Sequence, residues 1–343
     1  MSATAKNGGH RPVIHSVSPP AAIAGGDLEL RGSGLAPSGE RQSEVYFGEA
    51  RGRLVIGGSA RVVVRVPPEA QIDGLVLLAD GESSEPQTVS IGIPVAENLH
   101  PVANPAVDAE GNIFTTRSGT RGEKVPVSIF KIDTSLEIQP VISDVVNPTG
   151  LAVNRDGSLL VSSRHDGTIY SIAESGQVEV YAEGMGVATG IALDPDGNLY
   201  VGDRTGTIFK IAPDRQIFVF ATLEPSVAAY HLVFGPEGDL FVTGPTTSSF
   251  DAVMRIDRGG EVHEYVRGFG RPQGMAFDRA GKLFVAASYH GAKGIFRIDA
   301  EGDIRQMVSG PGVVGLAFLP DHAMVVATSS TIYRVSTQGW IEG

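Results

Sequence analysis

Short runs of alternating apolar and polar residues fill the chain, and no long stretch has the three- or four-residue spacing of an amphipathic helix. Each run ends in a turn rich in Gly, Pro, Asp or Asn. Short strands closed by such turns are typical of β-sandwiches and β-propellers. The pattern therefore predicts an all-β chain.

From about residue 96 onward the pattern repeats. Each unit holds a short apolar strand, a turn of the D-x-x-G kind and three more strands, as in ATGIALDPDGNLYVGD from Ala188, followed by GTIFKI and QIFVFA. The turn glycines, 40 to 46 residues apart, are Gly111, Gly157, Gly197, Gly238 and Gly281. His322 occupies the turn of a sixth, degenerate copy. Four strands per unit at this period predict a six-bladed β-propeller.

The sixth copy has too few residues for its outer strand. The segment SIGIPVAENLHPVANPAVDAEGN, which begins at Ser90, matches the end of one blade running into the next. We therefore expect the propeller to span residues 90–343, with residues 90–96 as the outer strand of the last blade. Such a closure leaves no open sheet edge at the seam.

Residues 12–92 differ from the repeats. Their short alternating runs, separated by Gly/Pro turns, predict a small β-sandwich. The pattern P-x-I-x-S-V-x-P, then G-G-x-L-x-L-x-G-S-G-L, V-Y-F-G and V-x-V-P-P, resembles the IPT/TIG immunoglobulin-like domain. The resemblance implies a spacer or a contact for a protein partner. The preceding residues, 1–11, are expected to form a disordered tail.

Charge and composition exclude several classes of function. The formal net charge of −12 argues against nucleic acid, which is bound through basic surfaces. The absence of Cys excludes disulfides and thiolate metal sites. No apolar stretch approaches the roughly 20 residues of a membrane span, and the N-terminus lacks the apolar core of a signal peptide. As written, the sequence predicts a cytoplasmic protein, or an extracytoplasmic one if an export signal has been removed.

The repeats are similar to the blades of NHL-repeat and SMP-30/gluconolactonase-like propellers, through P-x-G-[LIM]-A-x-[DN]-x-x-G-x-[LF]-x-V and a Gly-Thr-Ile-[YF] third strand. Gluconolactonases hold a divalent metal in the channel through Glu, Asn and Asp residues just before the inner strands, and the resemblance implies the same site here. Eight residues before each turn, this chain has Ala103, Thr149, Thr189, Tyr230, Gln273 and Val314. A hard cation takes about six to eight oxygen ligands, typically including carboxylates. We therefore predict no metal-lactonase site and no cofactor, and leave a bound divalent metal open.

At the next position four blades have Gly, and two have a side chain, Asn104 and His231. We expect the glycines to let the inner strands crowd the channel, so that these two side chains project into its mouth. The likeness to NHL-type lyases, which carry catalytic or metal-binding His there, makes His231 the candidate catalytic residue. The alternative is a histidine that fills the channel, bonded to backbone or water.

Three arginines, Arg117, Arg164 and Arg204, follow the second strands of blades one to three at equivalent positions, with a one-residue offset in blade one. Guanidinium groups at one mouth can hold a carboxylate or phosphate through bidentate hydrogen bonds. The alternative is ion pairing with neighbouring Asp residues. The other ligand-binding candidates around this mouth are Asn104, Tyr230, Gln273, Tyr289, His165 and His290.

Two functions follow from this reading. The first is a binding module that uses the propeller mouth for a small anionic molecule or peptide, with the sandwich as a spacer or partner contact. The alternative is a hydrolase or lyase of the gluconolactonase-like or NHL-lyase kind, with a non-standard site around His231. The lack of carboxylates at the metal-ligand positions favours the binding module over an enzyme.

Overall fold

The computed structural model describes residues 11–37, 42–70 and 73–340. The regular elements of these residues are all strands, so the prediction of an all-β chain is confirmed. The chain divides into two compact units: unit 1 is Met1–Ile93, Met307–Pro311 and Val335–Gly343, and unit 2 is Pro94–Gln306 and Gly312–Arg334. Among the described residues, no helix is long and apolar enough to cross a membrane.

Most of unit 1 consists of two antiparallel sheets of four strands each. The first has the order β1 (Val13–Ser18), β3 (Asp27–Ser33), β7 (Arg61–Arg65), β6 (Arg53–Ile56). The second has the order β5 (Ala50–Arg51), β4 (Glu44–Phe47), β8 (Val76–Ala79), β9 (Glu82–Ser83). Alternate residues from both sheets, such as Leu28, Val64, Val45 and Leu77, form one buried apolar cluster. Unit 1 therefore has a hydrophobic core of its own.

Of the disordered tail predicted at residues 1–11, the structure describes only Arg11. Residues 1–10 of that tail lie outside the described residues. The Arg11 side chain donates from Nε to the Ser83 carbonyl at 2.8 Å and pairs with Glu85 at 2.6 Å. Arg11 is thus held by side-chain contacts within unit 1.

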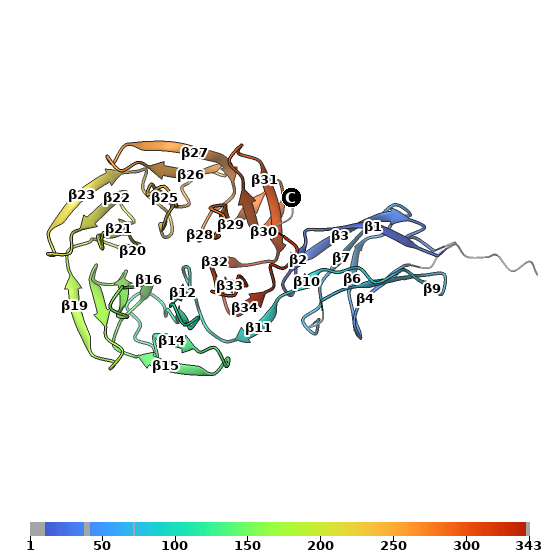
Figure 1. The fold of residues 1–343 in the computed structure, drawn as a ribbon, viewed down its shortest axis with the longest axis horizontal. Helices are drawn as coiled ribbons and strands as arrows, with labels where there is room; N and C mark the ends of the chain where they lie inside the picture. The colour runs from blue at the N-terminus through green and yellow to red at the C-terminus, as the bar shows by residue number, and fades with distance from the viewer. Residues whose placement is uncertain (1–10, 38–41, 71–72, 341–343) are drawn as a thin grey trace, which may run out of the picture. The chain divides into compact units, whose positions relative to one another are not determined.

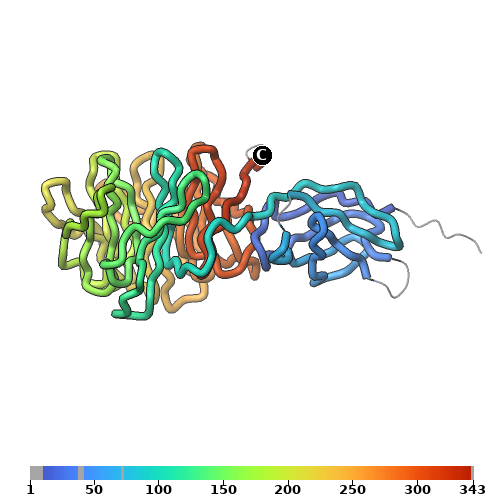
Figure 2. The backbone as a smooth tube through the Cα atoms, turned by 90° about the horizontal axis from the view of Figure 1, so that it is seen from below, coloured from blue at the N-terminus to red at the C-terminus, as the bar shows by residue number. Residues whose placement is uncertain are grey.

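Unit 2 is a ring of six blades around a central channel, and its predicted β-propeller fold is confirmed (Figure 1). Edge-on, the blades form a disc with turns on two opposite faces (Figure 2). Blades one to five, from the channel outward, are β12 (Ala106–Val107), β13 (Ile113–Thr116), β14 (Ile129–Ile132), β15 (Ile138–Ile142); β16 (Pro148–Val153), β17 (Leu159–Ser163), β18 (Ile169–Ile172), β19 (Val178–Ala182); β20 (Ala188–Leu193), β21 (Leu199–Asp203), β22 (Thr207–Ile211), β23 (Ile217–Thr222); β24 (His231–Phe234), β25 (Leu240–Thr243), β26 (Asp251–Ile256), β27 (Val262–Phe269); and β28 (Met275–Phe277), β29 (Leu283–Tyr289), β30 (Ala292–Ile298), β31 (Ile304–Ser309).

The sixth blade takes its outer strand from far away in the sequence. Its order is β32 (Val313–Phe318), β33 (Met324–Thr328), β34 (Ile332–Val335), β11 (Ile93–Ala96). The segment expected to close the ring, 90–96, is divided, because β10 (Ser90–Ile91) pairs in parallel with β2 (Ala21–Ala22) of unit 1. The Ile91 amide also donates to Asp73 Oδ1 at 2.8 Å. The strand in the last blade is therefore shorter than the repeat pattern predicts.

A tight turn joins the first two strands of each blade. In blade three, Gly197 has φ 85° and its amide donates to the Asp194 carbonyl at 3.1 Å. The Asp194 carboxylate accepts from the Asn198 amide at 2.9 Å. In blade six His322 adopts φ 70° at the equivalent place, a backbone conformation that residues other than Gly rarely adopt. The degenerate copy thus keeps the turn without its glycine.

Apolar side chains fill the spaces between blades. In one of the buried clusters, Leu160 of blade two packs with Ile191 and Val201 of blade three. On the other side of blade three, the ring of Tyr200 meets the edges of Phe220 and Phe234 at 4.9 and 5.0 Å. This packing fixes each blade against its neighbours and sets the width of the channel.

The inner strands lie so close together that the channel positions occupied by Gly have no space for a Cβ. A Cβ at Gly190 would stand 2.3 Å from the Tyr230 carbonyl oxygen, to which the Gly190 amide donates at 2.9 Å. A Cβ at Gly274 would stand 1.9 Å from Asn104 Oδ1 and 2.6 Å from the Gly315 Cα. The obstructing backbone atoms at both positions can move only if two blades separate. The crowding expected from the repeated glycines is present.

Gly190→Ala is expected to destabilise the propeller by about 2–3 kcal/mol, because the methyl group must push two blades apart. Chemical denaturation of the full chain measures this loss. The matched control is Gly259→Ala, at an exposed turn where the nearest atom is a flexible Asp257 oxygen at 3.2 Å. Equal effects of the two substitutions would show that channel crowding does not limit stability.

Candidate functional site

Two cavities lie along the propeller channel, one at each end. The first, here called the arginine cavity, has a volume of about 300 Å³ and lies where the inner strands begin. Its lining residues are His100, Pro101, Val102, Thr149, Arg164, Val187, Thr189, Arg204, Val227, Ala228, Ala229, His231, Gln273, Val314 and Ser329. The second, the opposite cavity, has about 340 Å³ and is lined by the rest of the inner strands, with Asn104 and several apolar side chains.

His231 is the residue that both cavities share. It opens β24 at the position where four other blades have Gly, and only 3% of it is exposed. Burial lowers the pKa of its imidazole to about 4. Among the described residues, none forms a hydrogen bond with the ring. His231 is therefore a neutral imidazole at pH 7, with its ring nitrogens left for whatever occupies the channel.

Asn104, the other side chain at this position, uses its amide group in hydrogen bonds to the backbone. Its Nδ2 donates to the Met275 carbonyl at 2.7 Å, and its Oδ1 accepts from the Leu316 amide at 3.1 Å. These bonds join the start of blade one to the inner strands of blades five and six. Asn104 thus closes the ring and lies at the opposite cavity, away from the arginines.

Arg164 follows β17 and lies half-buried in the wall of the arginine cavity. Its Nη2 makes two long hydrogen bonds of 3.2 Å, to Ser118 Oγ and the Gly119 carbonyl. Its Nε is buried without a hydrogen-bond partner. Burial, and then the charges of Arg204 and Arg121, lower the pKa of Arg164. The side chain is thus held by weak contacts beside like charges.

Arg204, after β21, is the second guanidinium of this cavity. Its Nε donates to the Ser226 carbonyl at 3.2 Å and its Nη2 to the Val227 carbonyl at 2.8 Å. These neutral partners fix the side chain without compensating its charge. The arginine cavity therefore carries two positive charges, and none of its described lining residues is acidic.

The aspartates that were candidates for pairing with these arginines bind elsewhere. The Asp203 carboxylate accepts from the Val187 amide at 2.8 Å and from the Thr205 hydroxyl. Asp166 accepts from the Thr168 amide at 3.1 Å and the Tyr170 hydroxyl at 2.9 Å. Within the described ranges, no carboxylate lies within 4.0 Å of either guanidinium. The structure thus does not support the ion-pair interpretation.

The structure brings together only part of the predicted site. Arg164, Arg204, Gln273 and His231 line the arginine cavity. Neither cavity reaches the other candidates, which are Arg117, His165, Tyr230, Tyr289 and His290.

Packing and exposure explain why those five lie elsewhere. Tyr230 is buried in the cluster between blades three and four, where its hydroxyl donates to the Glu224 carbonyl. Tyr289 packs against Phe269 and stacks on His290 at 4.1 Å. Arg117 and His165 are exposed.

Sequence reasoning discounted two threonines that belong to the cavity. Thr149 and Thr189 occupy positions that were tested only for metal-binding carboxylates. Their hydroxyls donate to the carbonyls of Asn147 at 3.3 Å and Gly202 at 2.8 Å. His100 and Ser329, which come from loops, complete the polar lining. Their place at the mouth follows from loop paths that the repeat does not specify.

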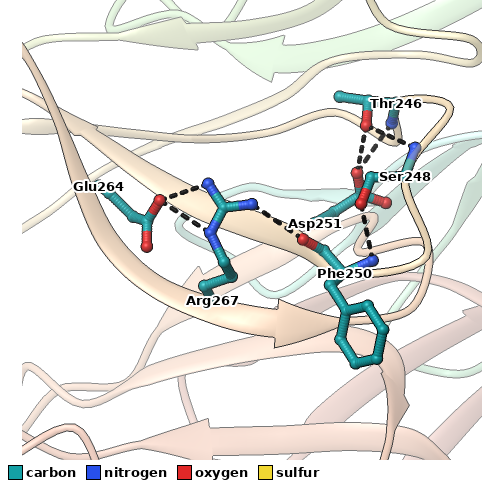
Figure 3. Close-up of polar contacts among 6 residues, drawn as sticks. All are labelled: Thr246, Ser248, Phe250, Asp251, Glu264 and Arg267. Atoms are coloured by element: carbon teal, nitrogen blue, oxygen red, sulfur yellow. Dashed lines mark hydrogen bonds and ion pairs between the residues drawn. The ribbon is translucent and has the colours of Figure 1, made fainter.

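The long loop of blade four holds itself in place (Figure 3). Asp251 Oδ1 accepts from the Thr246 amide and hydroxyl at 3.0 and 2.7 Å. The Ser248 hydroxyl accepts from the Phe250 amide at 3.0 Å, and Arg267 donates to the Phe250 carbonyl at 3.1 Å. The Phe250 side chain, 65% exposed, lines neither cavity. This loop therefore adds no wall to the arginine cavity.

The cavity does not fit the divalent metal that the gluconolactonase resemblance implies. His100 and His231 are its only His, Cys, Asp or Glu residues among those described, and two guanidiniums beside them repel a cation. Elsewhere in the described part of the chain, no group of three or more such side chains is placed to hold a metal ion. The lining suits an anion.

Comparisons with known proteins agree on the fold. A family profile described as strictosidine synthase-like, N-terminal, matches residues 190–211. No curated protein matches the chain.

Solved structures of similar fold include a gluconolactonase from Xanthomonas campestris, with 14% identity and a TM-score of 0.57 over 72% of this chain and 89% of the other. An auxiliary nutrient-binding protein from Bacteroides ovatus has 10% identity and a TM-score of 0.55 over 95% and 98%. Virginiamycin B lyase from Staphylococcus aureus has 15% identity and a TM-score of 0.51 over 71% and 97%. At these identities the likeness extends to the fold alone. The chain contains a gluconolactonase-like β-propeller.

Proposed function

We propose that the protein binds a small anionic molecule, or the acidic end of a peptide, in the arginine cavity. The observation that carries this proposal is the Arg164 guanidinium. Its Nε is buried without a partner, and Arg204 stands in the same cavity with no acidic side chain beside them. A carboxylate or phosphate would supply the missing negative charge and a charged acceptor for the two guanidinium groups.

The energetics favour such a ligand. A buried donor without an acceptor costs about 1–3 kcal/mol, and two like charges in one cavity repel each other. An anion that accepts from both guanidiniums relieves the repulsion between them. The chain as a whole is acidic, with a formal charge of −12, so the attraction is confined to this cavity.

Size and lining limit the class of ligand. A volume of about 300 Å³ lies at the small end of the roughly 300–1,000 Å³ of ligand pockets. Val102, Val187, Val227 and Val314 offer apolar contacts, and the Gln273 amide offers a donor and an acceptor. The cavity thus suits one acid group on a compact, partly apolar body. Proteins of similar fold that are described as nutrient-binding are a precedent for a binding role of this architecture.

We further propose that unit 1 is an immunoglobulin-like sandwich of the IPT/TIG kind that serves as a spacer or partner contact. Its two four-stranded sheets around one core support this. Most of its described arginines are paired with acids, as Arg61 is with Glu29 at 2.6 Å. Arg61→Gln should therefore leave anion affinity unchanged in titration calorimetry. A clear loss of affinity would contradict the spacer role.

A second candidate function, a hydrolase or lyase, is supported by His231. A neutral imidazole without a hydrogen bond from the described residues, at the floor of a cavity, has a lone pair that can accept a proton from a substrate. A screen of lactones and esters, with and without EDTA, separates this candidate from simple binding. Turnover that disappears in His231→Gln would establish the enzyme, and a bound ligand recovered unchanged would favour the binding module.

Arg164→Gln is expected to weaken the binding of inorganic phosphate or a short carboxylate by about 10–100-fold, because it removes a charged hydrogen-bond donor. Titration calorimetry and the ligand-induced rise in melting temperature measure the effect.

Arg117→Gln is the matched control for that experiment. Arg117 follows the second strand of blade one, one residue earlier in its repeat than Arg164, and it is exposed and lines neither cavity, so its substitution should leave the affinity unchanged. If both variants bind like the native protein, or lose binding equally, the arginine cavity is not the site.

His231 should also make stability depend on pH. The unfolded chain protonates this imidazole below about pH 6.5 and the folded protein only near 4, so the unfolded state binds more protons in between. The stabilisation is complete above pH 6.5 and is lost as the pH falls toward 4, by about 3 kcal/mol. Urea unfolding of the native protein and of His231→Gln across this range isolates the contribution. Parallel curves for the two proteins would show that the buried ring does not stay neutral.

A further inference from the structure

The connection between the second and third strands is much longer in blade one than in the two blades that follow. It spans residues 117–128 between β13 and β14, against 164–168 in blade two and 204–206 in blade three. The two short connections begin with the arginines that line the arginine cavity, so all three connections lie at that end of the channel. The long one, here called the blade-one loop, carries a further arginine, Arg121.

Asn147 ties the turn of the blade-one loop to Arg164. Its Nδ2 donates to the carbonyls of Gly119 and Thr120 at 3.0 and 2.9 Å, and its Oδ1 accepts from the Gly122 amide at 2.6 Å. The Asn147 carbonyl in turn accepts from the Arg164 amide at 3.2 Å. Only 1% of Asn147 is exposed, so water does not compete for these bonds. The turn that contains Arg121 is therefore fixed relative to the arginine cavity.

The residues on both sides of Arg121 lie against the short connection of blade two. Two residues before it, the Gly119 carbonyl accepts from Arg164 Nη2 at 3.2 Å. One residue after it, a Cβ at Gly122 would stand 3.6 Å from His165 Cε1. Burial lowers the pKa of Arg164, and the charge of Arg121 contributes to lowering it further. Arg121 is thus a third guanidinium near the two that line the cavity.

The charge of Arg121 is not neutralised by a neighbouring acid. The side chain is exposed, and no carboxylate of the described residues lies within 4.0 Å of its guanidinium. The carboxylate of Glu123, two residues later, accepts from the Thr120 amide and hydroxyl at 2.8 and 2.6 Å. Lys124, the other cation of the loop, is paired with Asp144 at 2.8 Å. The loop therefore keeps one uncompensated positive charge beside the cavity.

We propose that the ligand of the arginine cavity is a compact molecule with two acid groups, of which Arg164 and Arg204 hold the inner one and Arg121 the outer one. This inference rests on the proposed function, because it assigns the second end of the same ligand. Arg121 does not line the cavity, so the outer acid lies at the mouth and remains partly hydrated. Its desolvation cost is therefore small, and pairing with Arg121 favours a diacid over a monoacid of the same length.

Titration calorimetry with matched acids tests the proposal. The pairs are succinate and butyrate, glutarate and pentanoate, and adipate and hexanoate, each measured at low ionic strength so that salt does not screen an exposed charge. The native protein should bind the diacid of at least one pair about fivefold more tightly than its monoacid. Arg121→Gln should remove this preference and leave the affinity for the monoacid unchanged, because an exposed ion pair contributes up to about that factor.

Lys124→Gln is the matched control, because it removes the same charge from the same loop at a side chain that is already paired. It should keep the preference, and Arg121→Lys, which retains the charge, should keep most of it. If the native protein binds both acids of every pair equally, or if Lys124→Gln loses the preference as Arg121→Gln does, the inference is wrong while the proposed function stands. If no acid of the series binds, both are wrong.

A crystal structure with the tightest-binding dicarboxylate gives a second test, which does not depend on affinity. One carboxylate should lie at the guanidinium groups of Arg164 and Arg204, and the other within hydrogen-bond distance of the Arg121 guanidinium. An outer carboxylate that points into solvent away from Arg121 would overturn the inference.

Discussion

The close approach of the six inner strands is the constraint on which the rest of the structure depends. At Gly190 and Gly274 the channel wall has no space for a methyl group, because backbone atoms of the next blade stand within 2.3–2.6 Å of where it would be. This packing defines a narrow channel with a cavity at each end. In the two blades that lack this glycine, the side chain must find space in or beside the channel. Asn104 uses its amide to join three blades, whereas His231 leaves its imidazole between the cavities.

A rigid ring can hold side chains in positions that are unfavourable for them. Arg164 and Arg204 lie in one cavity, and the hydrogen bonds they make there go to neutral partners, Ser118 Oγ and backbone carbonyls. The aspartates that could neutralise them are used by the backbone and hydroxyl groups of their own turns. The cavity thus keeps a positive charge inside a strongly acidic protein. That separation of charge, more than the fold, points to an anion as the ligand.

The repeat pattern predicted the blades well, because the turn residues and the alternation of apolar positions are local properties of each copy. It also predicted that Arg164, Arg204, Gln273 and His231 share one end of the channel. It could not predict how side chains turn after the backbone has placed them. Arg117 lies one residue earlier in its repeat than Arg164 does and is exposed, and Tyr230 turns into the core between blades. The two cavity threonines were overlooked because only carboxylates were sought at their positions.

The most direct test of the central claim is a crystal structure of the protein grown with selenate, a tetrahedral oxyanion whose anomalous signal locates it without ambiguity. The account predicts a peak in the arginine cavity within hydrogen-bond distance of the Arg164 and Arg204 guanidinium groups. Density confined to exposed arginines such as Arg117, with the cavity holding only water, would contradict it.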